Sequence, residues 1–151
     1  APGDSVTVFT PVYYPFLDAI RETGRRLTPC PLANDGGRYT MDFAAVEAHF
    51  ATTGSKLLIF SSPHNPVGRV WRREELEQLG SICEKHGVTI LSDEIHQDLV
   101  LGSHPHIPTA TAVNCPVVTL CSASKTFNLA GLQNASSSCR RRCCGENTMP
   151  L

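Results

Sequence analysis

The sequence predicts an α/β domain with a mostly parallel sheet flanked by helices. Short runs rich in aliphatic and β-branched residues recur along the chain, and segments with helical periodicity separate them. Strands that alternate with helices pair in parallel, because each helix carries the chain back across the sheet. At 151 residues, the chain is long enough to form one domain with a real core.

The first third of the chain predicts a strand over residues 5–9 and a helix over 15–23. Pro15 suits the first turn of that helix, and Gly24 ends it. A second extended segment follows over 26–32. Asp42 is then expected to cap the N-terminus of a helix over 43–50, where apolar residues recur at helical spacing.

The middle of the chain carries the most apolar strands. Residues 56–61 and 88–91 are continuous apolar runs of the kind found in parallel strands buried on both faces. Between them, the clearest helix is predicted over 71–86, with an apolar stripe, a charged face and Gly87 as its end. Residues 102–115 predict a loop without periodicity, and 117–121 a final strand.

Polar side chains follow three of these strands. Asn65 comes after the first apolar run, Asp93 after the second, and Ser122-Ala123-Ser124-Lys125 after the last. Ligands of open α/β sheets collect at the carboxyl ends of strands. A desolvated lysine there becomes a Schiff-base nucleophile, and the two serines can donate to a phosphate. Taken alone, however, a Ser-x-Ser-Lys sequence is more often a solvated turn.

In order, Asn65-Pro66-Val67-Gly68, Asp93 and the Ser-x-Ser-Lys sequence resemble the fold-type-I pyridoxal-phosphate enzymes, the class I/II aminotransferase superfamily. The runs at 10–16 and 92–99 are similar to one branch, the MalY/PatB-type cystathionine β-lyases. The resemblance covers roughly residues 3–135. It implies a partial large domain that binds pyridoxal 5'-phosphate.

The resemblance implies a role for each matching residue. Lys125 is the Schiff-base lysine and general base, and Ser122 and Ser124 lie beside the phosphate. Tyr13 stacks on the pyridine ring, although from spacing alone a core aromatic residue is the more common interpretation. Asn65 contacts the 3-oxygen; the alternative is a polar turn residue.

Asp93 would bond to the protonated ring nitrogen, through a charge-assisted hydrogen bond that contributes about 1.5–3 kcal/mol. The alternative is that Asp93 caps a following helix while Glu94 lies on the surface. His96 replaces a tyrosine that is common in the superfamily, and this replacement fits the lyase branch.

The activity implied is a C–S β-lyase that converts cystathionine or cysteine S-conjugates to a thiol, pyruvate and ammonia. Two alternatives stay open. The same residues serve an aminotransferase of class I/II, and the chain can be an inactive fragment that lacks an N-terminal segment and a C-terminal domain. The family also implies a small amino-acid substrate and a homodimer.

Several classes of partner are not expected. The net charge of −1 gives no electrostatic case for nucleic acid or a membrane surface, and no apolar run approaches a membrane span. The seven cysteines include no Cys-x-x-Cys, so a reducing compartment, the cytoplasm, is expected, with Cys30, Cys83 and Cys121 in the core. His104 and His106 are expected at the surface rather than at a metal. Residues 136–151 are predicted to be a disordered tail outside the family domain of residues 1–135.

Overall fold

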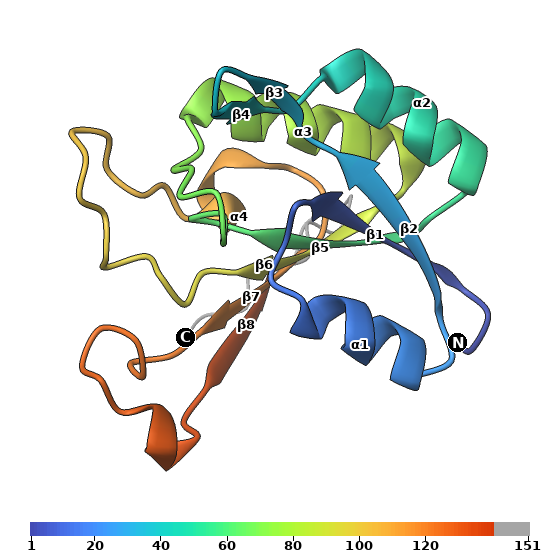
Figure 1. Ribbon diagram of the computed structural model, residues 1–151. Coiled ribbons are helices and arrows are strands. Elements are labelled where there is room, and N and C mark those ends of the chain that lie inside the picture. Colours follow the sequence, from blue (N-terminus) through green and yellow to red (C-terminus); the bar gives the residue numbers. More distant parts are fainter. Residues whose placement is uncertain (141–151) are drawn as a thin grey trace, which may run out of the picture.

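The computed structural model describes residues 1–140, which form a six-stranded sheet in the order β2-β1-β5-β6-β7-β8 (Figure 1). The neighbouring strands from β2 to β7 pair in parallel, and β8 is antiparallel to β7. The predicted α/β class is therefore confirmed. The strands of this sheet are β1 (Ser5–Thr10), β2 (Arg26–Pro31), β5 (Leu57–Ser61), β6 (Thr89–Asp93), β7 (Val117–Cys121) and β8 (Ser136–Arg140).

Helices lie on both faces of this sheet. Three of them, α2, α3 and α4, lie on one face, and α1 lies on the other (Figure 1). Asp42 caps α2 as predicted, because its Oδ1 accepts the N–H groups of Ala44 and Ala45 at 3.1 Å. Gly87 ends α3 with a φ of 64°, which a glycine adopts without strain. The helices are α1 (Pro15–Glu22), α2 (Phe43–Thr53), α3 (Arg73–His86), α4 (Thr109–Ala112) and the 3₁₀ turn η1 (Ala130–Leu132).

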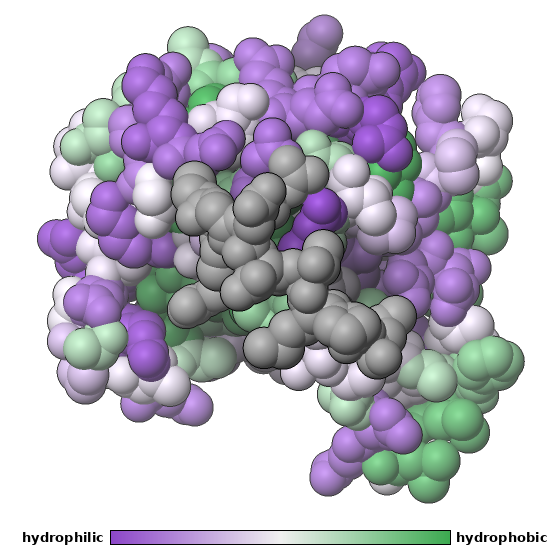
Figure 2. All heavy atoms as spheres, turned by 180° about the vertical axis from the view of Figure 1, so that it is seen from behind, coloured by the Kyte–Doolittle hydropathy of each residue, from purple (hydrophilic) through white to green (hydrophobic). Residues whose placement is uncertain are grey.

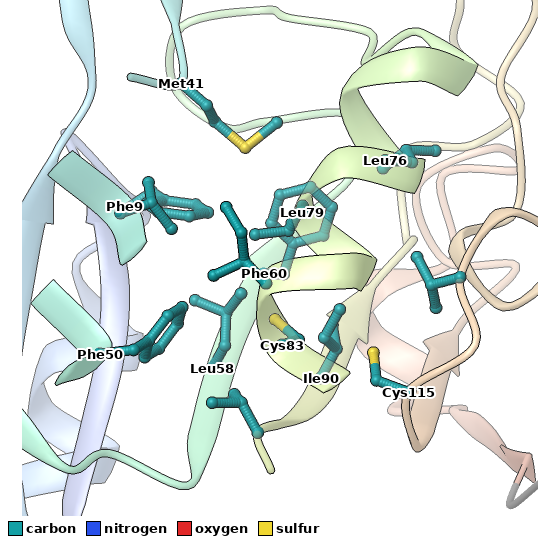
Figure 3. Packing of buried hydrophobic residues seen from close by; sticks show 14 of the residues in the cluster. Phe9, Met41, Phe50, Leu58, Phe60, Leu76, Leu79, Cys83, Ile90 and Cys115 are labelled. Carbon is teal, nitrogen blue, oxygen red and sulfur yellow. The ribbon is translucent and has the colours of Figure 1, made fainter. Parts of the chain in front are cut away.

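The main hydrophobic core fills the space between the sheet and the face covered by α2 and α3. Leu58 and Phe60 of β5 are fully buried there against Leu79 of α3 (Figure 3). Phe60 packs edge-on against Phe9 at a centroid distance of 6.0 Å and stacks on Trp71 at 5.9 Å. These aromatic contacts hold the carboxyl ends of β1 and β5 in place relative to each other.

The prediction that β5 and β6 are buried on both faces is wrong. Burial alternates along them: Leu58 and Ile90 are buried on the side of α3, whereas Leu57 and Leu91 are partly exposed on the opposite side. The reason is that, among the elements of residues 1–140, α1 alone covers that opposite face, and its cluster reaches only β1, β2 and β5. In contrast, Val6 and Val8 of β1 are buried beneath α1.

Three further segments differ from the sequence predictions. Residues 136–140, predicted to be disordered, form β8 because their backbone pairs with β7, although every residue of β8 is exposed. The rest of the predicted tail lies outside the described residues. The loop predicted at 102–115 contains α4, and a hairpin of β3 (Ala33–Asp35) and β4 (Arg38–Thr40) was not predicted.

Two of the three cysteines predicted to lie in the core, Cys30 and Cys83, are buried, whereas Cys121 is partly exposed. No helix within residues 1–140 has the length and apolar character needed to cross a membrane.

Candidate active site

The register of the parallel strands brings the predicted site residues to one edge of the sheet. Asp93, the last residue of β6, pairs with Ser61 of β5 and with Leu120 of β7. Asn65 follows Ser61 closely in sequence, and Lys125 follows Leu120. These groups therefore follow adjacent strands, and adjacent strands lie about 4.8 Å apart. The loops after β5, β6 and β7 all lie on the left of the molecule in Figure 1.

Tyr13 is tied directly to Asn65. The backbone N–H of Tyr13 donates to the carbonyl oxygen of Asn65 at 3.1 Å, and the N–H of Asn65 donates to Ser61 Oγ at 3.2 Å. The Tyr13 side chain is 44% exposed and meets the ring of Phe16 edge-on. The alternative that Tyr13 is a core aromatic residue is therefore wrong, and its ring is accessible at the site edge.

Asp93 has a half-buried carboxylate. Its Oδ1 accepts the N–H of Ile95 at 3.2 Å, and it forms no ion pair with a described lysine or arginine. Burial is the main cause that raises the pKa of Asp93 above its ordinary value of 3.8. No helix follows at residues 94–98, so the bond to Ile95 caps only a local turn. A carboxylate in this position is suited to a cationic ligand.

The turn after β7 presents Lys125 to solvent. The N–H of Ser124 donates to Ser122 Oγ at 3.0 Å, while Ser122 Oγ donates to the carbonyl oxygen of Asn134. Ser124 is buried, and Lys125 is exposed with no hydrogen bond to another described residue. The hydroxyl proton of Ser122 is thus already engaged within the loop, and a phosphate would compete with Asn134 for it.

His96 lies beside Asn65 along a groove of about 480 Å³. The groove runs between residues 63–70 and 96–104, with Leu99 and Leu101 on one wall. Neither Asp93 nor Lys125 lines it. His96 and Asn65 therefore share this groove.

Sequence reasoning missed a buried network beside Asp93. Glu94, which the alternative for Asp93 placed at the surface, is 1% exposed; it accepts hydrogen bonds from Ser92 Oγ at 2.9 Å, from the N–H of Thr109 at 3.0 Å and from His106 Nε2 at 2.9 Å. Burial raises the pKa of Glu94, but the bonds from His106, Thr109 and Ser92 outweigh it, so the net shift is downward. His106, also expected at the surface, is nearly buried in this pair.

Alternation along β6 is the signal that could have indicated this network. Ser92 and Glu94 point to one face of the sheet, whereas Asp93 points to the other. The partner, His106, is not visible in the sequence, because only the fold brings residues 94 and 106 together.

The chain matches the family described as aminotransferase class I and II over residues 1–144. It belongs to that family. Cystathionine beta-lyase PatB of Bacillus subtilis is 45% identical over 135 residues, which are 87% of this chain and 35% of that protein. Protein MalY of Escherichia coli is 38% identical over 133 residues, or 88% of this chain and 34% of that protein.

Solved structures are similar over the same stretch. The PLP-bound C-S lyase from Staphylococcus hominis has a TM-score of 0.86 and 39% identity, covering 91% of this chain and 36% of that one. Cystalysin from Treponema denticola, whose structure contains pyridoxal 5'-phosphate, has a TM-score of 0.82 and 40% identity over 90% of this chain and 35% of that one. The chain thus spans about a third of the length of these relatives. The match to residues 1–144 also extends past the boundary predicted at residue 135.

Proposed function

We propose that this chain is the cofactor-binding part of a pyridoxal-phosphate-dependent C–S β-lyase that acts on cystathionine or cysteine S-conjugates. The observation that carries the proposal is the placement of Tyr13, Asn65, Asp93 and Lys125. Asp93 is the last residue of β6, and the other three follow the carboxyl ends of β1, β5 and β7; these four strands are adjacent in the sheet. Relatives named as cystathionine β-lyases and PLP-bound C–S lyases share this stretch of chain.

The residues present fit pyridoxal phosphate. Asp93 offers a half-buried carboxylate without a cationic partner among the described residues, which suits a protonated pyridine nitrogen. Asn65 offers an amide to a phenolate oxygen, and Tyr13 an exposed ring for stacking. Ser122 and Ser124 would lie beside the phosphate.

The bound cofactor would supply an aldehyde that captures amines and a ring that accepts the electron pair released at Cα. Lys125 Nζ would hold the cofactor covalently until the amino group of the substrate replaces it. The freed amine of Lys125 would then remove the Cα proton as general base. Asp93 would keep the ring nitrogen protonated, and a protonated ring favours loss of the Cα proton of the substrate. The thiol would then leave from Cβ, and water would release pyruvate and ammonia.

An aminotransferase is the second candidate, because the same residues serve both reactions. The kynurenine–oxoglutarate transaminase 3 of Mus musculus is 33% identical over 140 residues, 86% of this chain and 30% of that protein. The higher identity to PatB and the presence of His96 favour the lyase.

A small amino-acid substrate and a second copy of the protein are the partners that we propose. Apolar side chains gather on the lobe formed by residues 122–135, at the lower right of Figure 2. Phe127 and Leu132 are 66% and 71% exposed there, next to Lys125 in the chain. Such a patch is typical of a surface that another protein unit covers. The free thiols of Cys30, Cys83 and Cys115 fit a reducing compartment, and we propose the cytoplasm.

The deciding experiment is the visible spectrum of the purified chain after addition of pyridoxal phosphate, compared with the Lys125→Ala variant. We expect a long-wavelength band that Lys125→Ala lacks. Lys85→Ala is the matched control, because Lys85 is an exposed lysine on α3 that pairs with Glu47. Pyruvate release from cystathionine then separates the lyase from a transaminase, which would instead exchange amino and keto acids. A band that survives in Lys125→Ala but not in Lys85→Ala would refute the assignment of Lys125.

A further inference from the structure

His64 is a buried histidine that lies between two segments of the proposed site. It is 1% exposed, and its ring meets Trp71 edge-on at a centroid distance of 5.6 Å. Its backbone is satisfied within its own loop: the N–H donates to the carbonyl of Arg69 and the carbonyl accepts from Gly68, both at 2.8 Å. The side chain, in contrast, bonds a residue outside this loop.

The imidazole reaches the connection between β1 and α1. His64 Nε2 lies 2.9 Å from the carbonyl oxygen of Pro11. A carbonyl oxygen only accepts, so Nε2 carries the proton. Burial is the main cause that lowers the pKa of His64 below its ordinary value of 6.5, which favours the neutral ring. Its Nδ1 is buried with no hydrogen-bond partner among residues 1–140.

This bond is one of two that fasten the same connection. Two residues after Pro11, the N–H of Tyr13 donates to the carbonyl of Asn65, the neighbour of His64. Consecutive residues of one loop, His64 and Asn65, thus hold alternate residues of the other, Pro11 and Tyr13. Trp71, which contacts the ring of His64, is itself fixed to the end of β5, because its Nε1–H donates to the carbonyl oxygen of Ser61 at 3.0 Å.

We propose that His64 is a positioning residue that fixes Tyr13 relative to Asn65, so that the ring of Tyr13 and the amide of Asn65 face the same ligand. The inference rests on the proposed function for the identity of that ligand. The contact between the two loops is observed independently of the proposed function. Two hydrogen bonds placed on alternate residues restrict a short connection more than either does alone, and precise placement of binding groups depends on such support.

The alternative is that His64 serves only as a core aromatic residue. His64→Phe separates the two roles, because phenylalanine keeps a ring against Trp71 but has no donor for Pro11. His64→Gln keeps a donor of similar reach. His49→Phe is the matched control: His49 is a partly buried histidine that bonds Thr7 within the core, away from the site edge.

The first measurement is amide hydrogen exchange of the full chain without cofactor. In His64→Phe, the Tyr13 amide should exchange about 5- to 10-fold faster, because its bond to Asn65 opens more often. The amides of Leu58 and Ile90 should not change. His64→Gln should restore part of the protection, and His49→Phe should leave Tyr13 as in the parent chain. An unchanged Tyr13 amide in His64→Phe would overturn the proposal.

The second measurement is the affinity for pyridoxal phosphate in a double-mutant cycle. Tyr13→Ala should weaken binding about 2- to 12-fold, the range expected for loss of one stacking contact. His64→Phe should weaken it in the parent chain but add little in the Tyr13→Ala background, because the residue that it positions is gone. Losses that multiply in the double variant would assign His64 a role independent of Tyr13 and overturn the proposal. Absence of any band that depends on Lys125 would count against the proposed function alone, and the exchange result would then decide the role of His64.

Discussion

The two faces of the sheet differ in how completely they are covered. On the face beneath α2, α3 and α4, the side chains of β5, β6 and β7 that point inward, such as Leu58 and Ile90, are buried. On the other face, α1 covers β1, β2 and part of β5, and Leu91 and Leu120 remain partly exposed. The strands are apolar on both sides, so their composition suits two covered faces. The site residue Asp93 points to the less covered face.

The same contrast holds for two consecutive residues. Glu94 points to the covered face, where three hydrogen bonds satisfy its carboxylate and the pKa is lowered. Asp93 points to the other face, where burial raises its pKa and, within residues 1–140, only the Ile95 N–H bonds the side chain. The hydrogen-bonding capacity of Glu94 is therefore met within the fold, whereas the carboxylate of Asp93 can still bind a ligand. From this difference we propose a structural role for Glu94 and a ligand-binding role for Asp93.

The largest effect is expected from leucine truncation on the covered face. Leu58→Ala should lower the free energy of unfolding by about 3–5 kcal/mol, since Leu58 is fully buried and its loss leaves a cavity. Leu91→Ala is the matched variant on the neighbouring strand, and we expect about 1–2 kcal/mol because that side chain is already partly exposed. Urea unfolding measures both. Equal losses would mean that the two faces are equally covered in solution.

An intermediate effect is expected when the buried pair beside the site is broken. Glu94→Ala removes the acceptor of three hydrogen bonds and should lower the free energy of unfolding by about 2–4 kcal/mol. Since the folded-state pKa of Glu94 is lowered, its contribution is present above the ordinary value of 4.5 and is lost as pH falls through the folded-state pKa.

The check is urea unfolding of Glu94→Ala and its parent at neutral and acidic pH. The difference in stability should shrink as the solution is acidified. Glu47→Ala is the control, because Glu47 lies on the surface of α2 and pairs with exposed Lys85. A loss of stability no larger than that of the control would contradict the role assigned to Glu94.

Local chemistry made much of the fold predictable. Asp42 and Gly87 mark helix ends whose caps depend only on neighbouring residues. The strand at Ser136–Arg140 was missed, because its serine-rich sequence has no apolar period and its pairing with β7 is a tertiary effect. The hairpin of β3 and β4 does have a local signal in the sequence, because Asp35-Gly36-Gly37 is typical of a tight hairpin turn.

The candidate site was predictable to a different degree. The placement of Asn65, Asp93 and Lys125 at one edge could be predicted, because strand ends are visible in the sequence and parallel strands end at the same edge. The partners His64 and His106 were not, since each acts on a residue far away in the chain. Sequence patterns thus identify polar groups at strand ends more readily than the buried groups that contact them from distant parts of the chain.

The smallest expected effect, and the one of opposite sign, is for Asp93→Asn. Removal of a half-buried carboxylate that lacks a cationic partner among the described residues should stabilise the cofactor-free chain at pH 7, by about 0.5–2 kcal/mol. The same change should weaken pyridoxal phosphate binding, because an amide does not pair with a protonated ring nitrogen as a carboxylate does. Gain of stability with loss of affinity is the signature of a residue retained for binding.

The pH dependence sharpens this test. A raised pKa means that the folded state binds the proton more tightly than the unfolded state, so the contribution of Asp93 is favourable below the ordinary pKa of 3.8 and is lost as pH rises through the folded-state value. The advantage of Asp93→Asn should therefore be present at pH 7 and vanish below 3.8, when the parent carboxyl is also neutral. Asp35→Asn, at an exposed carboxylate, should show no such dependence. If Asp93→Asn were instead destabilising at pH 7, the carboxylate would be satisfied within the fold, and the distinction between Asp93 and Glu94 would not hold.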